Sequence, residues 1–185
     1  MNNIVISKEE ILHTTRELIM EQGWSEVNIR SVAAACGVSV GSIYNYFSSK
    51  AELVGALVEN VWYEVFHHSP EMEVMQDTCS CLSWIYNRLE YGCRQYPGFF
   101  SKHSLRFMQE EKSDGKRLMQ HTWQHILDKL SAVLKHDPKI RADAFDENFS
   151  AEEFAEILFS LILAALLRQD FDPSAVLKLV RKTLY

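Results

Sequence analysis

Three short motifs mark where helices begin, and they constrain this chain more than any other feature. Each motif is Ser-x-x-Glu, at residues 7–10, 49–52 and 150–153. In such a capping box the serine hydroxyl accepts the backbone N–H three residues on, and the glutamate accepts the serine's own N–H. Apolar residues at helical spacing follow each box, and 185 residues contain only 7 Gly and 4 Pro. The sequence therefore predicts an all-α fold.

Turn residues and apolar stripes place the other helices. Gly23 ends the first helix, Asn28 is suited to cap the second, and Ser39 precedes a short third. We expect a helix-turn-helix domain at 1–50, joined by a long helix to a helical ligand-binding and dimerisation domain at 51–185. The expected helices are 8–22, 29–36, 40–47, 50 to before Pro70, 73–96, 98–109, 116–136, 151–169 and one after Asp172-Pro173, with 137–148 irregular.

Composition narrows the class of protein. Hydrophobic residues make up 47% and charged residues 24%, which suits a folded domain with a sizeable core. The most apolar run, 157–167, is shorter than the roughly 20 residues of a membrane span. The N-terminus has no basic region followed by an apolar stretch, so the four cysteines are interpreted as reduced thiols. We expect a cytoplasmic protein that does not enter a membrane.

The segment 28–50 carries the functional signal. Two short helices, 29–36 and 40–47, are joined by a tight turn at Gly37-Val38-Ser39. This is the helix-turn-helix arrangement, in which the second helix enters the major groove of DNA. Residues 1–60 hold four Lys or Arg against seven Asp or Glu, yet 27–51 contains two cations and no acid. The local charge is therefore compatible with DNA binding, although it does not by itself indicate it.

The same segment, NIRSVAAACGVSVGSIYNYFSSK, resembles the N-terminal domain of the TetR family. The family pattern is T-x-R-x-I-A-x-x-A-G-V-S-x-G-T-L-Y-x-H/Y-F-x-x-K-x-x-L, and the strong matching covers about residues 7–65. Departures are Asn28 for Thr and Cys36 for Ala, both of which suit their places. The outright matches are Arg30, Ala33, Gly37, Val38, Ser39, Gly41, Tyr44, Tyr46, Phe47, Lys50 and Leu53.

The resemblance implies a set of contacts with double-stranded operator DNA. Small residues at 40–42 allow the backbone to approach the bases, and an asparagine can bond adenine at two points. Few polar groups are available for direct readout, so Arg30, Asn45 and DNA shape are expected to provide discrimination. Asn28 could serve only as a cap, and Tyr44 could lie partly in the core. The implied phosphate contacts are Asn28, Ser39, Tyr44, Tyr46 and Lys50, and the implied base contacts are Arg30, Val40, Gly41, Ser42 and Asn45.

The resemblance also implies C-terminal helices that dimerise and bind an effector. The helix at 151–169 is apolar around nearly its whole circumference, so it needs cover on both sides. We expect it to form a homodimer interface together with 116–136. An aromatic pocket would suit an apolar or aromatic small molecule, although each aromatic residue could equally fill the core. The candidates are Trp62, Phe66, Trp84, Leu89, Phe99, Phe100, Phe107, Trp123 and Phe159, with His103 and Arg106 placed to orient an anionic group.

These features predict a DNA-binding repressor that a small molecule releases from its operator. The alternative is a regulator without such a ligand, controlled by a protein partner or by its abundance. No nucleophile with a base, carboxylate pair or phosphate-binding glycine loop appears at recognisable spacing, so we expect neither an enzyme nor a cofactor. His121 and His125, with Asp128, have metal-ligand spacing on a helix but lie away from the main apolar stripe, and we expect no metal there.

Overall fold

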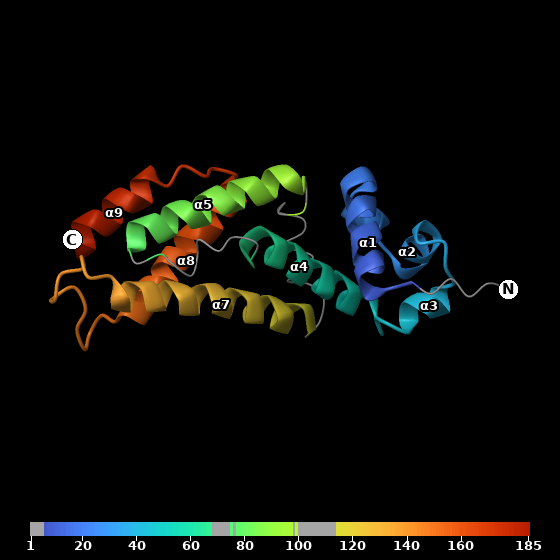
Figure 1. The fold of residues 1–185 in the computed structure, drawn as a ribbon, viewed down its shortest axis with the longest axis horizontal. Coiled ribbons are helices and arrows are strands. Elements are labelled where there is room, and N and C mark those ends of the chain that lie inside the picture. The colour runs from blue at the N-terminus through green and yellow to red at the C-terminus, as the bar shows by residue number, and fades with distance from the viewer. Residues whose placement is uncertain (1–5, 68–74, 76, 98, 100–113) are drawn as a thin grey trace. The chain divides into compact units, whose positions relative to one another are not determined.

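The computed structural model describes residues 6–67, 75, 77–97, 99 and 114–185, with only the backbone described at 67, 114–122 and 125. Within these ranges every regular element is a helix, which confirms the all-α prediction (Figure 1). No helix in them is long and apolar enough to cross a membrane. The chain forms two compact units, residues 1–64 with 96–120 and residues 65–95 with 121–185. The functional boundary expected between residues 50 and 51 stays a prediction.

The helix boundaries follow the sequence signals closely. The helix expected at 98–109 falls outside the described residues, and the short 3-10 helix η1 was not predicted. The bounds are α1 Lys8–Gln22, η1 Trp24–Glu26, α2 Ile29–Ala35, α3 Val40–Tyr44, α4 Lys50–His67, α5 Thr78–Gln95, α7 Asp114–His136, α8 Ala151–Arg168 and α9 Ser174–Leu184.

The three serine motifs form helix caps, although one differs from the prediction. Ser7 and Ser150 form complete capping boxes at the starts of α1 and α8. The Ser49 hydroxyl likewise accepts the N–H of Glu52, at 3.1 Å. The Glu52 carboxylate, however, accepts the N–H and hydroxyl of Ser48 instead, each at 2.7 Å. The third box is therefore formed by two adjacent serines.

Two predicted helix ends were wrong by a few residues. The helix expected from about 73 begins at Thr78, because the Asp77 carboxylate accepts the N–H of Ser80 at 2.9 Å and acts as its cap. The helix expected at 40–47, α3, ends at Tyr44, and the residues after it form a tight turn. There the N–H groups of Tyr46 and Phe47 both donate to the carbonyl of Ile43, at 3.0 Å.

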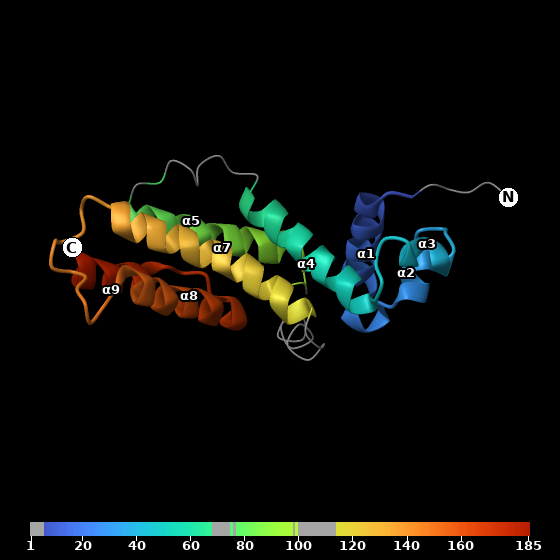
Figure 2. The same cartoon turned by 90° about the horizontal axis from the view of Figure 1, so that it is seen from below.

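The first unit contains the three helices that the DNA-binding prediction concerns. Figure 2 shows α1, α2 and α3 packed together ahead of α4. Each contributes fully buried apolar side chains, which form a common core. That core includes Ile11, Leu12, Leu18, Ile19, Val32, Ala33, Ile43, Phe47 and Leu53.

In the second unit a buried carboxylate joins three segments. α5 and α9 lie side by side (Figure 1), and Asp137 follows the last residue of α7. One Asp137 oxygen accepts the N–H and hydroxyl of Thr78, at 2.8 and 3.0 Å, and the hydroxyl of Tyr185 at 2.5 Å. Its other oxygen accepts the N–H of Lys139 at 3.0 Å. Asp137 therefore links the start of α5 to the residues that follow α7 and α9.

The pKa of Asp137 reflects two opposing effects. Burial raises the pKa, but the hydrogen bonds from Tyr185, Thr78 and Lys139 together bring it below its ordinary value. A carboxyl whose pKa is lower in the folded than in the unfolded protein stabilises the fold once it is ionised. That contribution is present above the unfolded-state pKa and is lost as pH falls through the folded-state value.

We predict that Asp137→Asn lowers the free energy of unfolding by about 1–3 kcal/mol at pH 7, because its amide cannot accept from all of these donors. The difference in free energy of unfolding between the variant and the parent should narrow below about pH 4, where the aspartate of the unfolded chain begins to protonate. Urea unfolding followed by circular dichroism measures both effects. The exposed Asp143→Asn, in the same segment, is the control. Equal stability of the Asp137 variant and the parent at pH 7 would contradict the prediction.

Candidate nucleic-acid interface

The turn between α2 and α3 is fixed by backbone geometry. Gly37 has a φ of 66°, in the left-handed region that a glycine adopts without steric strain. The next N–H, from Val38, donates to the carbonyl of Ala33 at 3.0 Å. Ser39 then caps α3, and its hydroxyl accepts the N–H of Ser42 at 3.1 Å. These bonds set the direction in which α3 leaves the turn.

Burial separates the segment 28–50 into core and surface residues. Ile43 and Phe47 are fully buried, and they anchor α3 to the helices behind it. All ten residues predicted to contact DNA are at least partly exposed. The exposed ones are Asn28, Arg30, Ser39, Val40, Gly41, Tyr44, Asn45 and Tyr46, and the half-buried ones are Ser42 and Lys50. Their roles toward DNA remain predictions.

Several of these side chains already have structural tasks. The Asn28 oxygen accepts the N–H groups of Arg30 and Ser31, each at 3.0 Å, and its amide nitrogen donates to the carbonyl of Glu26. Asn28 is thus a full N-cap of α2, which strengthens the view that capping is its whole role. The hydroxyls of Ser39 and Ser42 lie 2.9 Å apart and form a hydrogen bond with each other.

The two tyrosines of the segment differ in what their hydroxyls do. Tyr44 is 53% exposed, and its hydroxyl forms no hydrogen bond within the described residues. The Tyr46 hydroxyl donates to the carbonyl of Ile6, with the two oxygens 2.5 Å apart. A phosphate oxygen is also an acceptor, so the Tyr46 proton cannot serve both partners at once. Tyr44 is therefore the better placed of the two for a phosphate contact.

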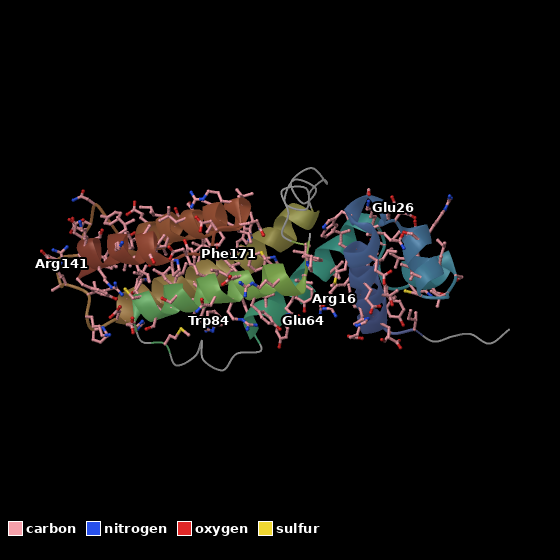
Figure 3. The ribbon with its side chains drawn as sticks, turned by 90° about the horizontal axis from the view of Figure 1, so that it is seen from above. Arg16, Glu26, Glu64, Trp84, Arg141 and Phe171 are labelled. Atoms are coloured by element: carbon pink, nitrogen blue, oxygen red, sulfur yellow. The ribbon has the colours of Figure 1, made fainter. Side chains whose placement is uncertain are left out.

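A polar cluster in the first unit was missed by the sequence analysis. Arg16 and Glu64 form an ion pair with 2.7 Å between their atoms, and their side chains point toward each other in Figure 3. The Tyr96 hydroxyl donates to the same Glu64 oxygen at 2.5 Å, and the Arg16 guanidinium lies over the Tyr96 ring. The separation of 48 residues between Arg16 and Glu64 left no local signal by which to pair them.

The predicted ligand-binding residues divide between the two units. Trp62 and Phe99 belong to the first unit, and Phe99 packs against Trp24 with ring centroids 5.0 Å apart. In the second unit Phe66 packs edge-on against Trp84, and Trp123 against Phe159. Phe100, His103, Arg106 and Phe107 lie outside the described residues. The packing of Phe99 favours a role in the core for that residue.

Two indole groups in the second unit are incompletely satisfied. The Nε1 atoms of Trp84 and Trp123 are buried and have no hydrogen-bond partner among the residues that the structure describes. Leaving a buried donor unpaired costs about 1–3 kcal/mol, so such a group usually marks a place where water or a ligand accepts it. Trp84 is itself almost completely buried, and Trp123 partly so.

The cysteines and histidines give no comparable signal. All four cysteines are free thiols, and burial raises the pKa of Cys81 to about 11. Burial likewise raises the pKa of Cys36, which favours a structural rather than a redox role for this residue. No group of three metal-ligating side chains occurs among those that the structure describes. The side chains of His121 and His125 are not among them.

The short α2 and α3, joined by their fixed turn, form a helix-turn-helix, the arrangement by which many DNA-binding proteins place a helix in the major groove. Residues 11–57 match the model of the family described as bacterial regulatory proteins, tetR family. The match covers the helix-turn-helix segment, about a quarter of the chain, so this segment is similar to the regulatory proteins of that family.

Two curated relatives and one solved structure illustrate the similarity. An HTH-type regulator in the lacX 3' region of Lactococcus lactis subsp. lactis is 28% identical over 102 residues, covering 49% of this chain and 52% of that protein. The regulator YvdT of Bacillus subtilis (strain 168) is 38% identical over 53 residues, 29% of this chain and 27% of YvdT. The alignments thus span about half of the first relative and about a quarter of the second.

The likeness of fold extends along nearly the whole chain. The structure of FadR from Bacillus subtilis, in complex with stearoyl-CoA, superposes with a TM-score of 0.69. The superposition covers 97% of this chain and all of FadR, at 16% sequence identity. At that identity the match concerns the fold, while the helix-turn-helix match concerns sequence as well.

Gly41 offers a test that separates folding from DNA binding. A Cβ added there would meet only the Ser39 hydroxyl, at 3.7 Å, which is an ordinary contact. We predict that Gly41→Ala leaves the melting temperature unchanged or slightly higher, because alanine favours helix. Operator affinity should nevertheless fall by tenfold or more, because the methyl group prevents the close approach of backbone to DNA. Fluorescence anisotropy with a selected operator measures the affinity, and Ala35→Ser at an exposed position is the control. Unchanged affinity would show that DNA does not approach Gly41.

Proposed function

We propose that this protein is a homodimeric repressor that acts in the cytoplasm and leaves its operator when a small, largely apolar molecule binds its second unit. The observation that supports an effector is the pair of buried indole N–H groups of Trp84 and Trp123, which have no hydrogen-bond partner in the described part of the chain. Both stand beside aromatic rings, those of Phe66 and Phe159. An apolar molecule with at least one hydrogen-bond acceptor could pack against these rings and accept a hydrogen bond from an indole N–H.

The fold neighbour lends support to an effector of this kind. FadR of Bacillus subtilis was solved with stearoyl-CoA, which joins a long apolar chain to a carbonyl and a polar head. A regulator controlled by a protein partner or by abundance is the second candidate. It requires no ligand in the second unit.

We predict that an effector raises the melting temperature of the protein and, in the same concentration range, weakens binding to an operator selected from random DNA. Saturated fatty acids and their CoA thioesters are the first probes, followed by aromatic acids. Trp84→Phe keeps a ring beside Phe66 and removes only the N–H donor. It should weaken the effector about fivefold to 100-fold while operator affinity without effector stays the same.

Trp24→Phe is the matched control, because it changes a tryptophan in the first unit and should leave effector affinity unchanged. A panel in which no compound alters either melting or DNA binding would favour the second candidate. An effector that binds the Trp84→Phe variant and the parent with equal affinity would instead show that the Trp84 N–H group does not contact the effector.

The dimer proposal rests on exposed apolar side chains. Ile157 and Leu167 of α8 and Leu179 of α9 are each 44% exposed, which leaves apolar side chains on both helices available to pack against a second copy. Among the described side chains of α7, no large apolar one is exposed to that degree. The interface expected from 116–136 and 151–169 is therefore better assigned to α8 with α9.

We predict that Leu167→Glu shifts the protein from dimer to monomer in sedimentation velocity at micromolar concentration, because two new carboxylates would face each other across a two-fold interface. The helical circular dichroism signal should be retained. Lys178→Glu, on a different side of α9 from Leu179, should leave the dimer intact. A parent protein that sediments as a monomer would refute the dimer, and a dimeric Leu167 variant would move the interface elsewhere.

A further inference from the structure

We propose that Lys8 binds a DNA phosphate, and that Tyr46 supports DNA binding by holding the segment that carries Lys8. In this view Tyr46 is a positioning residue, and its hydroxyl does not itself contact the DNA backbone. The proposal rests only on DNA binding by the helix-turn-helix, so it stands apart from the effector and dimer proposals.

The first support is the hydrogen bond between Tyr46 and Ile6. It joins Tyr46, two residues after the end of α3, to a residue 40 positions earlier, with 2.5 Å between the oxygens. The Ile6 side chain is buried, so both its backbone and its side chain are held. Ser7, the N-cap of α1, follows at once. The start of α1 is thereby fixed next to the C-terminal end of α3.

The second support is the position of the Lys8 side chain. Its ammonium lies 5.5 Å from the ring centroid of Phe47, in a cation–π contact, and the residue is exposed. Phe47 comes directly after Tyr46, so two successive residues hold Ile6 and Lys8 in place. A lysine with its stem along an aromatic ring and its charge in solvent is well suited to reach a phosphate.

Electrostatics explain why one additional cation would matter. Between residues 27 and 51 the only cations are Arg30 and Lys50, and each phosphate neutralised contributes to affinity. Three acids lie near Lys8, namely Glu9 and Glu10, which follow it in the sequence, and Glu52, and the last two are engaged in caps. The Glu10 carboxylate accepts the N–H of Ser7 at 2.7 Å, and that of Glu52 accepts from Ser48. Lys8 offsets their negative charge at the place where the protein surface meets DNA.

A pKa shift is consistent with this arrangement. Hydrogen bonds from Ser48 are the main cause that lowers the pKa of Glu52, and the charge of Lys8 lowers it further. The Lys8 ammonium is therefore close enough to affect the electrostatic potential at the start of α4, where Lys50 lies. Lys8 and Lys50 would then supply positive charge from two separate helices.

The first test replaces the charge of Lys8. Lys8→Met keeps the length of the side chain and should lower operator affinity at low salt. It should also reduce the slope of log affinity against log salt concentration by about one, because one phosphate contact is lost. Lys8→Arg should restore both quantities. A salt slope equal to that of the parent would refute the role of Lys8, because a change in folding alone does not alter the number of ions released.

The second test is a double-mutant cycle. Tyr46→Phe removes only the hydroxyl and should weaken binding threefold or more in the parent. In the Lys8→Met background the same change should have little further effect, because the segment then carries no phosphate ligand. Tyr44→Phe is the matched control, since its hydroxyl is available to DNA, and its effect should be the same in both backgrounds.

Additive effects of Tyr46→Phe and Lys8→Met would overturn the positioning role, since a direct phosphate contact by Tyr46 predicts additivity. Operator affinity equal to that of the parent in the Tyr46→Phe single variant would also overturn the positioning role. Melting curves for all variants identify any loss of fold, and binding is compared at a temperature where each variant is fully folded. The salt slope remains interpretable even for a variant of lower stability.

Discussion

The DNA-binding surface depends on how two very short helices are kept folded. α2 has seven residues and α3 has five, whereas isolated helices below about 12–15 residues are marginal in water. Each begins with a side chain that accepts free N–H groups, Asn28 for α2 and Ser39 for α3. Burial of Val32, Ile43 and Phe47 supplies the rest. Caps and core together fix a surface that neither helix would hold alone.

The use of polar side chains as helix caps leaves few of them available to contact DNA. Side chains that cap helices or bond each other are partly committed before any DNA arrives, as Asn28, Ser39 and Ser42 show. Arg30, Tyr44 and Asn45 remain exposed on the surface. Under the proposed function, direct readout would come from few groups, and DNA shape would be correspondingly more important. Each cation near this surface would then contribute substantially to DNA affinity, even though the net charge of the protein is negative.

Local signals explain what the sequence predicted well. The caps at Ser7, Asn28 and Ser150 lie within three residues of the groups they bind, so their motifs are visible in the sequence. Contacts over long separations carry no such signature. The bonds from Tyr46 to Ile6 and from Thr78 to Asp137 depend on how helices pack. For this reason most helix boundaries were predicted to within a few residues, while the partner of Tyr46 was not predicted.

Long-range polar contacts also indicate how the first unit is held together internally. Glu64 lies near the end of α4, and it accepts both from Arg16 in α1 and from Tyr96, which follows α5. A partly buried carboxylate shared by a guanidinium and a phenol is sensitive to small movements of either partner. α4 begins at Lys50, beside the recognition helix, and continues past Glu64 to His67 in the second unit. Within the first unit Glu64 thus joins α4 and Tyr96 to α1, and the N-terminal residues of α1 are in turn held by Tyr46 and Phe47.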